Sequence, residues 1–394
     1  MRLVKVMAVA LTVFSFSYGE TVKQLIDYAL KNSPIIKSKI YEMKQSEGEI
    51  KSAEALPNPE AYVQFGRLYS QSESGFNLTE FSVHQPLKLW GTRKNAVEEA
   101  LLKKEAAQLK LQFYKNQVAG QVYQLFYQTL FAKEVLSIRK ENYNLSLSLH
   151  NLVKKSYRLG EETKLNLLRS EKELKLSYLE FKQAENMYQS KLRELSSIVG
   201  KEIKDVEGNI SDIHSLHQIQ LENLPEIKYL SKISASIDKA IELQKGLSKP
   251  QIGIEFTAGE DAAELGKYEF GIGITASVPV FYKNQGEIIK LINQKKSVLF
   301  EKKQKELFYR SKIKNIKSRY SLLKSQIDEL DRQILLSISQ ALKLAEKSYK
   351  MRAITLFELS DIKKQYFETL MYRATLLKDV HNTIGEYIKI GGIR

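Results

Sequence analysis

The chain has 394 residues, of which 43% are hydrophobic and 27% are charged, which is enough for a folded core. It has no cysteine, which excludes disulfides, cysteine-bound metals, nucleophilic thiols and a lipid anchor on a cysteine. The formal net charge is +15, but the basic residues are spread along helical stretches rather than clustered. They therefore indicate a solvated helix surface and no nucleic-acid partner.

The first residues indicate secretion. Arg2 and Lys5 precede an apolar run at residues 6–16, and small residues follow it at the spacing that a signal peptidase reads. This predicts a cleaved signal peptide over residues 1–19, with a short buried helix as the alternative. The run is shorter than the roughly 20 residues of a membrane-spanning helix, and later apolar stretches are broken by polar residues. Entry into a membrane would therefore require strands that close into a barrel.

Prolines divide the chain into two similar halves. Six of the seven form three pairs about 190 residues apart: Pro34 with Pro225, Pro59 with Pro250, and Pro86 with Pro279. Nearly the same offset relates Tyr157 to Tyr349, Thr163 to Thr355, and Gly200 to Gly392. Such a constant offset predicts an internal duplication, with structural repeats at residues 20–222 and 223–394.

Each predicted repeat has the same order of elements: a helix, two strands and a long helical hairpin without proline. Strands are expected at about residues 61–70, 76–86, 251–260 and 267–280, where apolar and polar residues alternate. The helical hairpins are expected at about residues 88–200 and 284–392. A helix over residues 94–159 would be about 100 Å long and would need partners along its length, as in a coiled-coil bundle.

The four strands predict a shared barrel. Each has the length of a transmembrane strand, with one apolar face and one face of Gly, Thr, Ser and Glu. Trp90, Phe281 and Tyr282 lie near the strand ends and suit a membrane interface, although a half-buried soluble sheet with core aromatics would show the same pattern. A sheet in hydrocarbon cannot leave an edge unpaired, and single-chain barrels begin at eight strands. We therefore expect several chains to contribute to one barrel.

This organisation resembles the TolC-like outer-membrane efflux protein family over nearly the whole mature chain. The resemblance rests on the duplication and on short segments in a fixed order. These are Leu-Pro-Asn-Pro at residues 56–59, Gln-Pro-Leu at 85–87 with Trp-Gly at 90–91, Val-Pro-Val-Phe at 278–281, and Tyr-Arg-Leu-Gly at 157–160. None of these segments is specific for the family by itself, but their order and their occurrence in both halves of the chain are specific.

The resemblance implies a mixed α/β membrane protein. Four transmembrane β-strands per chain would form a trimeric 12-stranded β-barrel in the outer membrane, continued by a long periplasmic α-helical coiled-coil barrel. A homotrimer of this kind would contact outer-membrane lipid, a periplasmic adaptor (membrane-fusion) protein and an inner-membrane transporter. The metal-efflux and multidrug branches are both implied, so metal ions, small organic molecules and peptides are all open as cargo.

No enzyme chemistry is indicated. His214 and His217 have the spacing of two metal ligands on a helix, but no third ligand follows and surface histidines are favoured. The chain lacks a phosphate loop and a nucleophile elbow. We expect no catalytic residue, no metal site and no cofactor.

A duct requires a gate, and by resemblance the gate lies at the helical hairpin tips, within residues 159–170 and 351–362. Glu358 and Asp361 are one turn apart and would form an acidic ring around the pore, with ordinary exposed helix acids as the alternative. Tyr349 would hold Asn166 in the closed state, and Tyr157 occupies the equivalent place in the first repeat. The residues expected to contact the adaptor are Leu159, Gly160, Thr163, Arg352 and Thr355.

The competing interpretation is a periplasmic coiled-coil adaptor or a structural protein without a channel. An adaptor would have one helical hairpin flanked by β-domains, and not two strand pairs within a repeat. In a channel, the turns at residues 71–75 and 260–267 would face the cell exterior.

Overall fold

The structure is a computed structural model that describes residues 19–68, 76–260 and 267–392. The predicted signal peptide (except Gly19), the end of one predicted strand at residues 69–70, the turn at 71–75 and most of the turn at 260–267 lie outside the described residues. The chain forms two compact units. The first comprises Met1–Ser33, Asn116–His217 and Asn315–Arg394, and the second comprises Pro34–Lys115 and Gln218–Lys314. Each unit thus contains residues from both predicted repeats.

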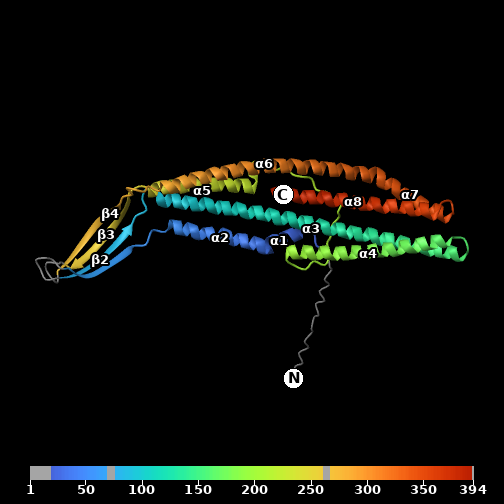
Figure 1. The fold of residues 1–394 in the computed structure, drawn as a ribbon, viewed down its shortest axis with the longest axis horizontal. Helices are drawn as coiled ribbons and strands as arrows, with labels where there is room; N and C mark the ends of the chain where they lie inside the picture. The colour runs from blue at the N-terminus through green and yellow to red at the C-terminus, as the bar shows by residue number, and fades with distance from the viewer. Residues whose placement is uncertain (1–18, 69–75, 261–266, 393–394) are drawn as a thin grey trace, which may run out of the picture. The chain divides into compact units, whose positions relative to one another are not determined.

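The second unit contains a four-stranded antiparallel sheet and the helices next to it (Figure 1). Its strands are β1 (Glu60–Leu68), β2 (Phe76–Pro86), β3 (Gln251–Glu260) and β4 (Tyr268–Ser277). The helices that precede the strand pairs are α2 (Pro34–Glu54) and α5 (Pro225–Leu247), which follows a 3₁₀ turn, η1 (Leu221–Asn223). Proline begins both helices, as suits a first-turn position whose N–H would have no helical partner.

One face of the sheet is apolar and exposed. The register pairs Val63 with Phe81, Phe256 with Ile272, and Ile254 with Ile274, so these side chains lie on one face. Ile272 is 83% exposed. The opposite face carries polar residues such as Glu80, Ser82 and Thr257. The alternation predicted from the sequence is therefore present in the sheet, and no other described residues cover its apolar side.

Both edges of the sheet are open within the described residues. The strand order is β1-β2-β3-β4, so β1 pairs only with β2 and β4 pairs only with β3. Strands from the two halves of the chain meet at the centre, where β2 pairs with β3 through contacts such as Val83 with Phe256. An open edge next to an exposed apolar face is a template for another strand.

The first unit is built from helices. It contains α1 (Val22–Asn32), α4 (Lys164–Val199), α7 (Leu335–Lys350) and α8 (Leu356–Gly391). The long helices α3 (Thr92–Arg158) and α6 (Gln285–Glu329) contribute residues to both units. A π-helical segment, η2 (Leu330–Ile334), joins α6 to α7, and its Asp331 accepts two hydrogen bonds from Arg373 at 2.6 and 2.9 Å.

The helices of each hairpin run side by side in opposite directions, α3 with α4 and α7 with α8 (Figure 1). Apolar residues of α3, α4 and α8 form a core that includes Val122, Phe126, Leu195 and Leu377. Among the described residues, no helix is both long enough and apolar enough to cross a bilayer.

Two glycines allow α3 and α8 to approach closely in this core. A Cβ atom on Gly120 would lie 2.6 Å from the carbonyl oxygen of Gly385, and one on Gly385 would lie 3.1 Å from the carbonyl oxygen of Gly120. Neither backbone oxygen can move aside as a flexible side chain would. Glycine at both positions therefore fixes the distance between the two helices.

His381 is fully buried beside this crossing. Its Nε2 lies 2.8 Å from the carbonyl oxygen of Ile210, which can only accept, so Nε2 carries the hydrogen. Its Nδ1 then accepts from the Tyr123 hydroxyl at 3.0 Å, and its ring stacks on Tyr127 with centroids 3.5 Å apart. Burial lowers the pKa of His381 to about 4, so the ring is neutral at pH 7.

This burial predicts acid-dependent stability of the first unit. An unfolded histidine titrates near pH 6.5, so the stability due to the neutral ring is complete above that pH and is lost as the pH falls toward 4. We expect the free energy of unfolding to fall by about 2 kcal/mol between pH 7.5 and pH 5, because unfolding allows His381 to take up a proton. Urea unfolding followed by circular dichroism should show a smaller pH difference in His381→Gln. An equal pH difference in both proteins would exclude this origin.

Candidate functional site

The two hairpin tips of the first unit have the same backbone turn. Gly160 follows the end of α3 with a φ of 76°, and Arg352 follows the end of α7 with a φ of 61°. The N–H of Gly160 donates to the carbonyl of Tyr157, and the N–H of Arg352 donates to the carbonyl of Tyr349. The sequence offset thus relates residues in equivalent turns, although Arg352 adopts a left-handed conformation that is costly for a side chain other than glycine.

Threonine caps the helix that follows each tip. The Thr163 hydroxyl accepts from the N–H of Asn166 at 3.1 Å, and the Thr355 hydroxyl accepts from the N–H of Glu358 at 3.2 Å. Both threonines therefore supply an acceptor for a helix N-terminal N–H group. Both sites were expected to contact an adaptor, and the structure shows in addition that they define where α4 and α8 begin.

Glu162 connects the two tips. The Tyr349 hydroxyl donates to Glu162 Oε1 at 2.8 Å, and the Asn166 side-chain amide donates to Glu162 Oε2 at 2.8 Å. Tyr349 and Asn166 thus both contact Glu162, which lies between them in place of a direct bond. Arg352 forms an ion pair with Glu161 at 2.6 Å, which is a second link between the tips.

The electrostatics of Glu162 favour its ionised form. Burial by itself would raise its pKa, but hydrogen bonds from Asn166, Tyr349 and the N–H of Thr163 hold the pKa below its ordinary value. Burial and the bond to Glu162 raise the pKa of Tyr349, so its hydroxyl keeps its proton and donates it. The link is therefore a charge-assisted hydrogen bond, which is stronger than one between neutral groups.

The other predicted gate residues do not join this cluster. The Glu358 carboxylate accepts from the N–H and the hydroxyl of Thr355 at 2.7 and 2.9 Å, so it completes the cap of α8. The same bonds lower the pKa of Glu358. Asp361 is exposed and accepts from Gln365 at 2.8 Å. Tyr157 is exposed, with Lys164 above its ring at 5.6 Å.

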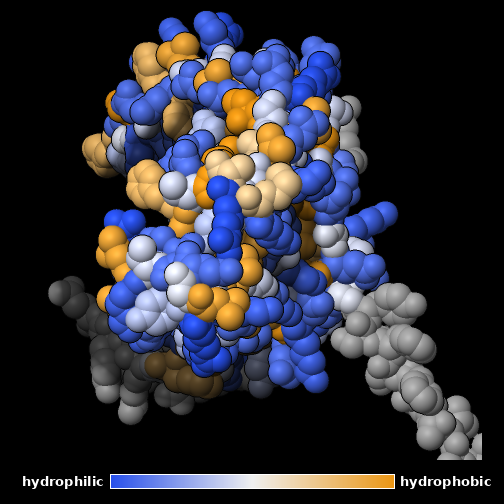
Figure 2. Space-filling model, turned by 90° about the vertical axis from the view of Figure 1, so that its right-hand side faces the viewer, coloured by the Kyte–Doolittle hydropathy of each residue, from blue (hydrophilic) through white to orange (hydrophobic). Residues whose placement is uncertain are grey.

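The tips expose apolar side chains. Leu159, Leu165, Leu168, Met351 and Phe357 are all exposed. Apolar side chains stand among hydrophilic ones on the surface seen in Figure 2. Such residues suit contact with another protein.

The predicted interface aromatics lie at the helical end of the sheet in the second unit. Trp90 has a φ of 58°, and its indole N–H donates to the carbonyl of Pro250 at 2.6 Å. Phe281 and Tyr282 follow β4, and Phe281 is 98% exposed. These side chains continue the exposed apolar face of the strands.

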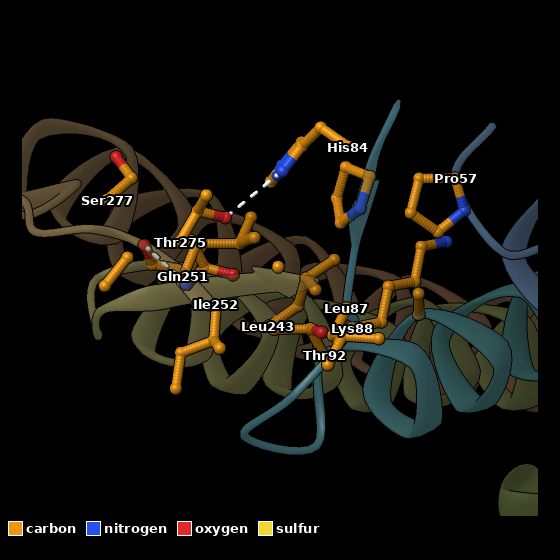
Figure 3. Close-up of a pocket in the computed structure, with 15 residues that line it drawn as sticks. Pro57, His84, Leu87, Lys88, Thr92, Leu243, Gln251, Ile252, Thr275 and Ser277 are labelled. Atoms are coloured by element: carbon orange, nitrogen blue, oxygen red, sulfur yellow. Dashed lines mark hydrogen bonds between the residues drawn. The ribbon is translucent and has the colours of Figure 1, made fainter. Parts of the chain in front are cut away.

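A cavity of about 620 Å³ lies at the same end of the sheet (Figure 3). In it, His84 Nδ1 lies 3.1 Å from the Thr275 hydroxyl, and Leu243, Leu247 and Ile252 contribute apolar walls. The described residues contain no group of three His, Asp or Glu side chains that could hold a metal ion. Nothing in this cavity points to catalysis.

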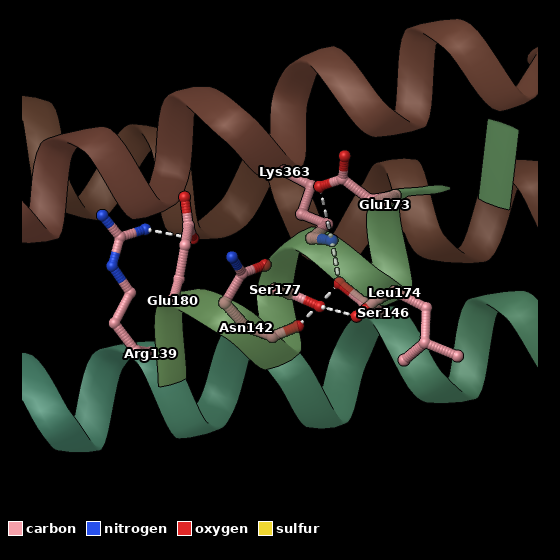
Figure 4. Close-up of polar contacts among 8 residues, drawn as sticks. All are labelled: Arg139, Asn142, Ser146, Glu173, Leu174, Ser177, Glu180 and Lys363. Carbon is pink, nitrogen blue, oxygen red and sulfur yellow. Dashed lines mark hydrogen bonds and ion pairs between the residues drawn. The ribbon is translucent and has the colours of Figure 1, made fainter. Parts of the chain in front are cut away.

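Lys363 of α8 is a buried charge that the sequence analysis did not identify. It is 3% exposed, and no other Lys, Arg, Asp or Glu in the described part of the chain is buried. Its Nζ lies 2.5 Å from the Ser146 hydroxyl of α3 and 3.4 Å from Glu173 of α4 (Figure 4). The Ser146 hydroxyl donates onward to the carbonyl of Asn142, whose side-chain oxygen is buried without a partner. Burial lowers the pKa of Lys363 against the opposing charge of Glu173.

Parts of the chain are similar to known proteins. Residues 25–201 match the model of the outer membrane efflux protein family. The cobalt-zinc-cadmium resistance protein CzcC of Cupriavidus metallidurans is 20% identical over 338 residues, which cover 83% of this chain and 79% of CzcC.

Solved structures show the same fold. A structure of CusC described in terms of transmembrane channel formation has a TM-score of 0.79 and 16% identity, covering 94% of this chain and 92% of CusC. The outer membrane protein VceC of Vibrio cholerae has a TM-score of 0.76 and 13% identity, covering 94% of this chain and 97% of VceC. The fold is thus that of these solved structures, and residues 25–201 are similar to the outer membrane efflux protein family.

The buried lysine predicts an unequal response to two substitutions. Lys363→Met removes a desolvated ammonium and leaves Ser146 bonded to Asn142, so we expect unfolding free energy to stay within about 1 kcal/mol or to rise. Ser146→Ala removes the nearest acceptor of the buried ammonium and should cost about 1–3 kcal/mol. Denaturant unfolding of both variants in detergent measures the difference. A larger loss in Lys363→Met than in Ser146→Ala would contradict it.

Proposed function

We propose that this protein is the outer-membrane channel of a tripartite export system, in which three copies share one barrel and pass cargo to the exterior. The observation that carries the proposal is the sheet of the second unit, with four strands, an exposed apolar face and two open edges. In hydrocarbon the backbone groups at such edges need partners, because no water is present to bind them. The similarity of residues 25–201 to the outer membrane efflux protein family supports the same function.

The number of copies follows from strand number and resemblance. Single-chain barrels begin at eight strands, so four strands require at least one further chain. The resemblance to the TolC-like outer-membrane efflux family implies a barrel of twelve strands, to which each of three chains contributes four. We infer that β1 of one copy pairs with β4 of the next.

Disulfide crosslinking tests this closure in a chain that has no cysteine of its own. Val63→Cys on β1 would be combined in turn with Phe270→Cys, Ile272→Cys or Ile274→Cys on β4. Within one chain these positions are about 14 Å apart across the sheet, which is too far for a disulfide. We therefore expect at least one combination to give a ladder of two and three chains, and none longer, on non-reducing gels.

The control for crosslinking is Ser82→Cys with Thr257→Cys, which are register partners on β2 and β3. This pair should crosslink within one chain and give no ladder. A ladder that extends beyond three chains, or the absence of any link between chains, would refute the shared twelve-stranded barrel.

The gate of this channel is proposed to lie at the hairpin tips, with Tyr349, Glu162 and Asn166 as the closing contact. The support is the pair of 2.8 Å hydrogen bonds that Glu162 accepts from the two residues. Separation of the α7–α8 hairpin from the α3–α4 hairpin would break the bond to Tyr349. Asp361 is the stronger candidate for an acidic ring, because the Glu358 carboxylate already caps α8.

Single-channel conductance in planar bilayers tests the gate. Tyr349→Phe removes one hydrogen bond, worth about 0.5–1.5 kcal/mol net, from each of three copies, so we expect the conductance to rise. Tyr157→Phe is the matched control, because Tyr157 occupies the equivalent turn but is exposed and has no bond to Glu162. If the two variants have equal conductance, the constriction does not lie at the contact between Tyr349 and Glu162.

Partners and cargo follow from the class. The exposed tip residues are the proposed contact for a periplasmic adaptor, which would link the channel to an inner-membrane transporter. The name of the relative CzcC points to divalent metal cations as cargo. In agreement, the polar face of the described strands carries Glu60, Glu80, Glu255 and Glu269, and no Lys or Arg. A periplasmic adaptor without a channel would instead be released from the membrane fraction when no detergent is added.

A further inference from the structure

Basic residues collect where the strands of the second unit meet its helices. We call this region the strand–helix junction and define it as residues 55–59, 87–97, 243–250 and 278–286. Its charged side chains are Lys88, Arg93, Lys94, Lys245, Lys249 and Lys283. Five glutamates directly flank these ranges, so the net charge of the region depends on which cations they pair with: Glu54, Glu60, Glu98, Glu242 and Glu287.

Four of these six cations have no carboxylate partner. Lys94 pairs with Glu98 and Lys245 pairs with Glu242. Among the described residues, no ion pair is formed by the other four, which are Lys88, Arg93, Lys249 and Lys283. Elsewhere in the chain many lysines are paired with acids on the same or a neighbouring helix. The junction therefore presents positive charge that this chain does not neutralise.

The cations are held in place around Trp90. Lys249 lies over the Trp90 ring with Nζ 5.2 Å from its centroid, and the indole donates to the neighbouring carbonyl of Pro250. Lys88 Nζ and Arg93 Nε donate to the carbonyls of Ala55 and Glu54 at the end of α2, each at 2.8 Å. Helix carbonyls offset only part of a full charge, and Arg93 retains N–H groups that those bonds do not use.

The apolar face of the sheet ends at this junction. Beyond β4 the side chains of Val278, Val280 and Phe281 are exposed, and Tyr282 and Lys283 follow them directly. Along the chain the order is therefore apolar strand, aromatic residues, then cations. After β2, Trp90 likewise lies next to cations, between Lys88 and Arg93.

We propose that the strand–helix junction binds the headgroups of anionic phospholipids in the leaflet next to the helical part of the protein. The inference rests on the proposed function, because the apolar face must contact acyl chains for the junction to reach the headgroups. Aromatic side chains concentrate at that depth, and clustered Lys and Arg bind anionic headgroups. Lys249, Lys283 and Arg93 form no ion pair among the described residues, so their N–H groups can donate to lipid phosphates. Without such a lipid, water must solvate these charges.

Native mass spectrometry of the purified protein in detergent tests the proposal. The protein would be titrated with phosphatidylglycerol and with phosphatidylcholine of identical acyl chains. Each cation near the surface contributes up to about fivefold in affinity, so we expect phosphatidylglycerol to bind at least tenfold more tightly. The quadruple variant Lys88→Gln, Arg93→Gln, Lys249→Gln, Lys283→Gln should reduce that preference to threefold or less.

The matched control removes four unpaired, exposed cations from α6: Lys314→Gln, Lys317→Gln, Arg319→Gln and Lys324→Gln. It has the same change in net charge and should keep the preference. If the quadruple junction variant does not assemble, Lys249→Gln with Lys283→Gln carries the test, because neither side chain caps a helix. Salt at 1 M, where the Debye length is about 3 Å, should abolish the preference in the unchanged protein.

The outcomes separate the two proposals. An assembled protein that binds both lipids equally would overturn the headgroup site and leave the channel intact. An equal loss of preference in the α6 control would reduce the effect to general charge and would also overturn it. Failure of the unchanged protein to form an oligomer would instead count against the proposed function.

Discussion

The unpaired backbone at the two edges of the β1–β4 sheet is the constraint on which the rest of the molecule depends. A four-stranded sheet with an exposed apolar face is stable in water only if something covers it, and in hydrocarbon only if its edges are paired. In the proposed channel, copies of the same chain would satisfy both needs. Exposed apolar residues of α6, such as Phe300 and Leu307, would also be covered by neighbouring copies.

The two hairpin tips show how the same backbone turn can carry different side-chain contacts. Both tips have a left-handed residue, the same turn hydrogen bond and a threonine cap. The side chains differ, because Glu161 and Glu162 in the first tip face Arg352 and Tyr349 from the second. A contact between two equivalent turns therefore becomes a specific pair of donor and acceptor, which a symmetric pair of turns could not provide.

Local patterns in the sequence were sufficient for much of this fold. Alternation with a period of two located the strands, and the proline offset predicted which turns would be equivalent, because both signals depend on neighbouring residues. Glu162 and Lys363 were missed for the opposite reason. Glu162 follows another acid in an ordinary polar loop, and Lys363 is one lysine among many in a helix. Only the packing of α8 against α3 and α4 decides that one of those lysines is buried.

The π-helical segment Leu330–Ile334 has a geometric consequence for the tip. A π segment holds one residue more than an α-helical turn, and each extra residue rotates all later side chains by about 100° around the helix axis. The segment thus sets the angular phase of α7 independently of α6. Deleting one residue there would turn Tyr349 through about a quarter of a circle and away from Glu162, although every residue of the tip would be unchanged.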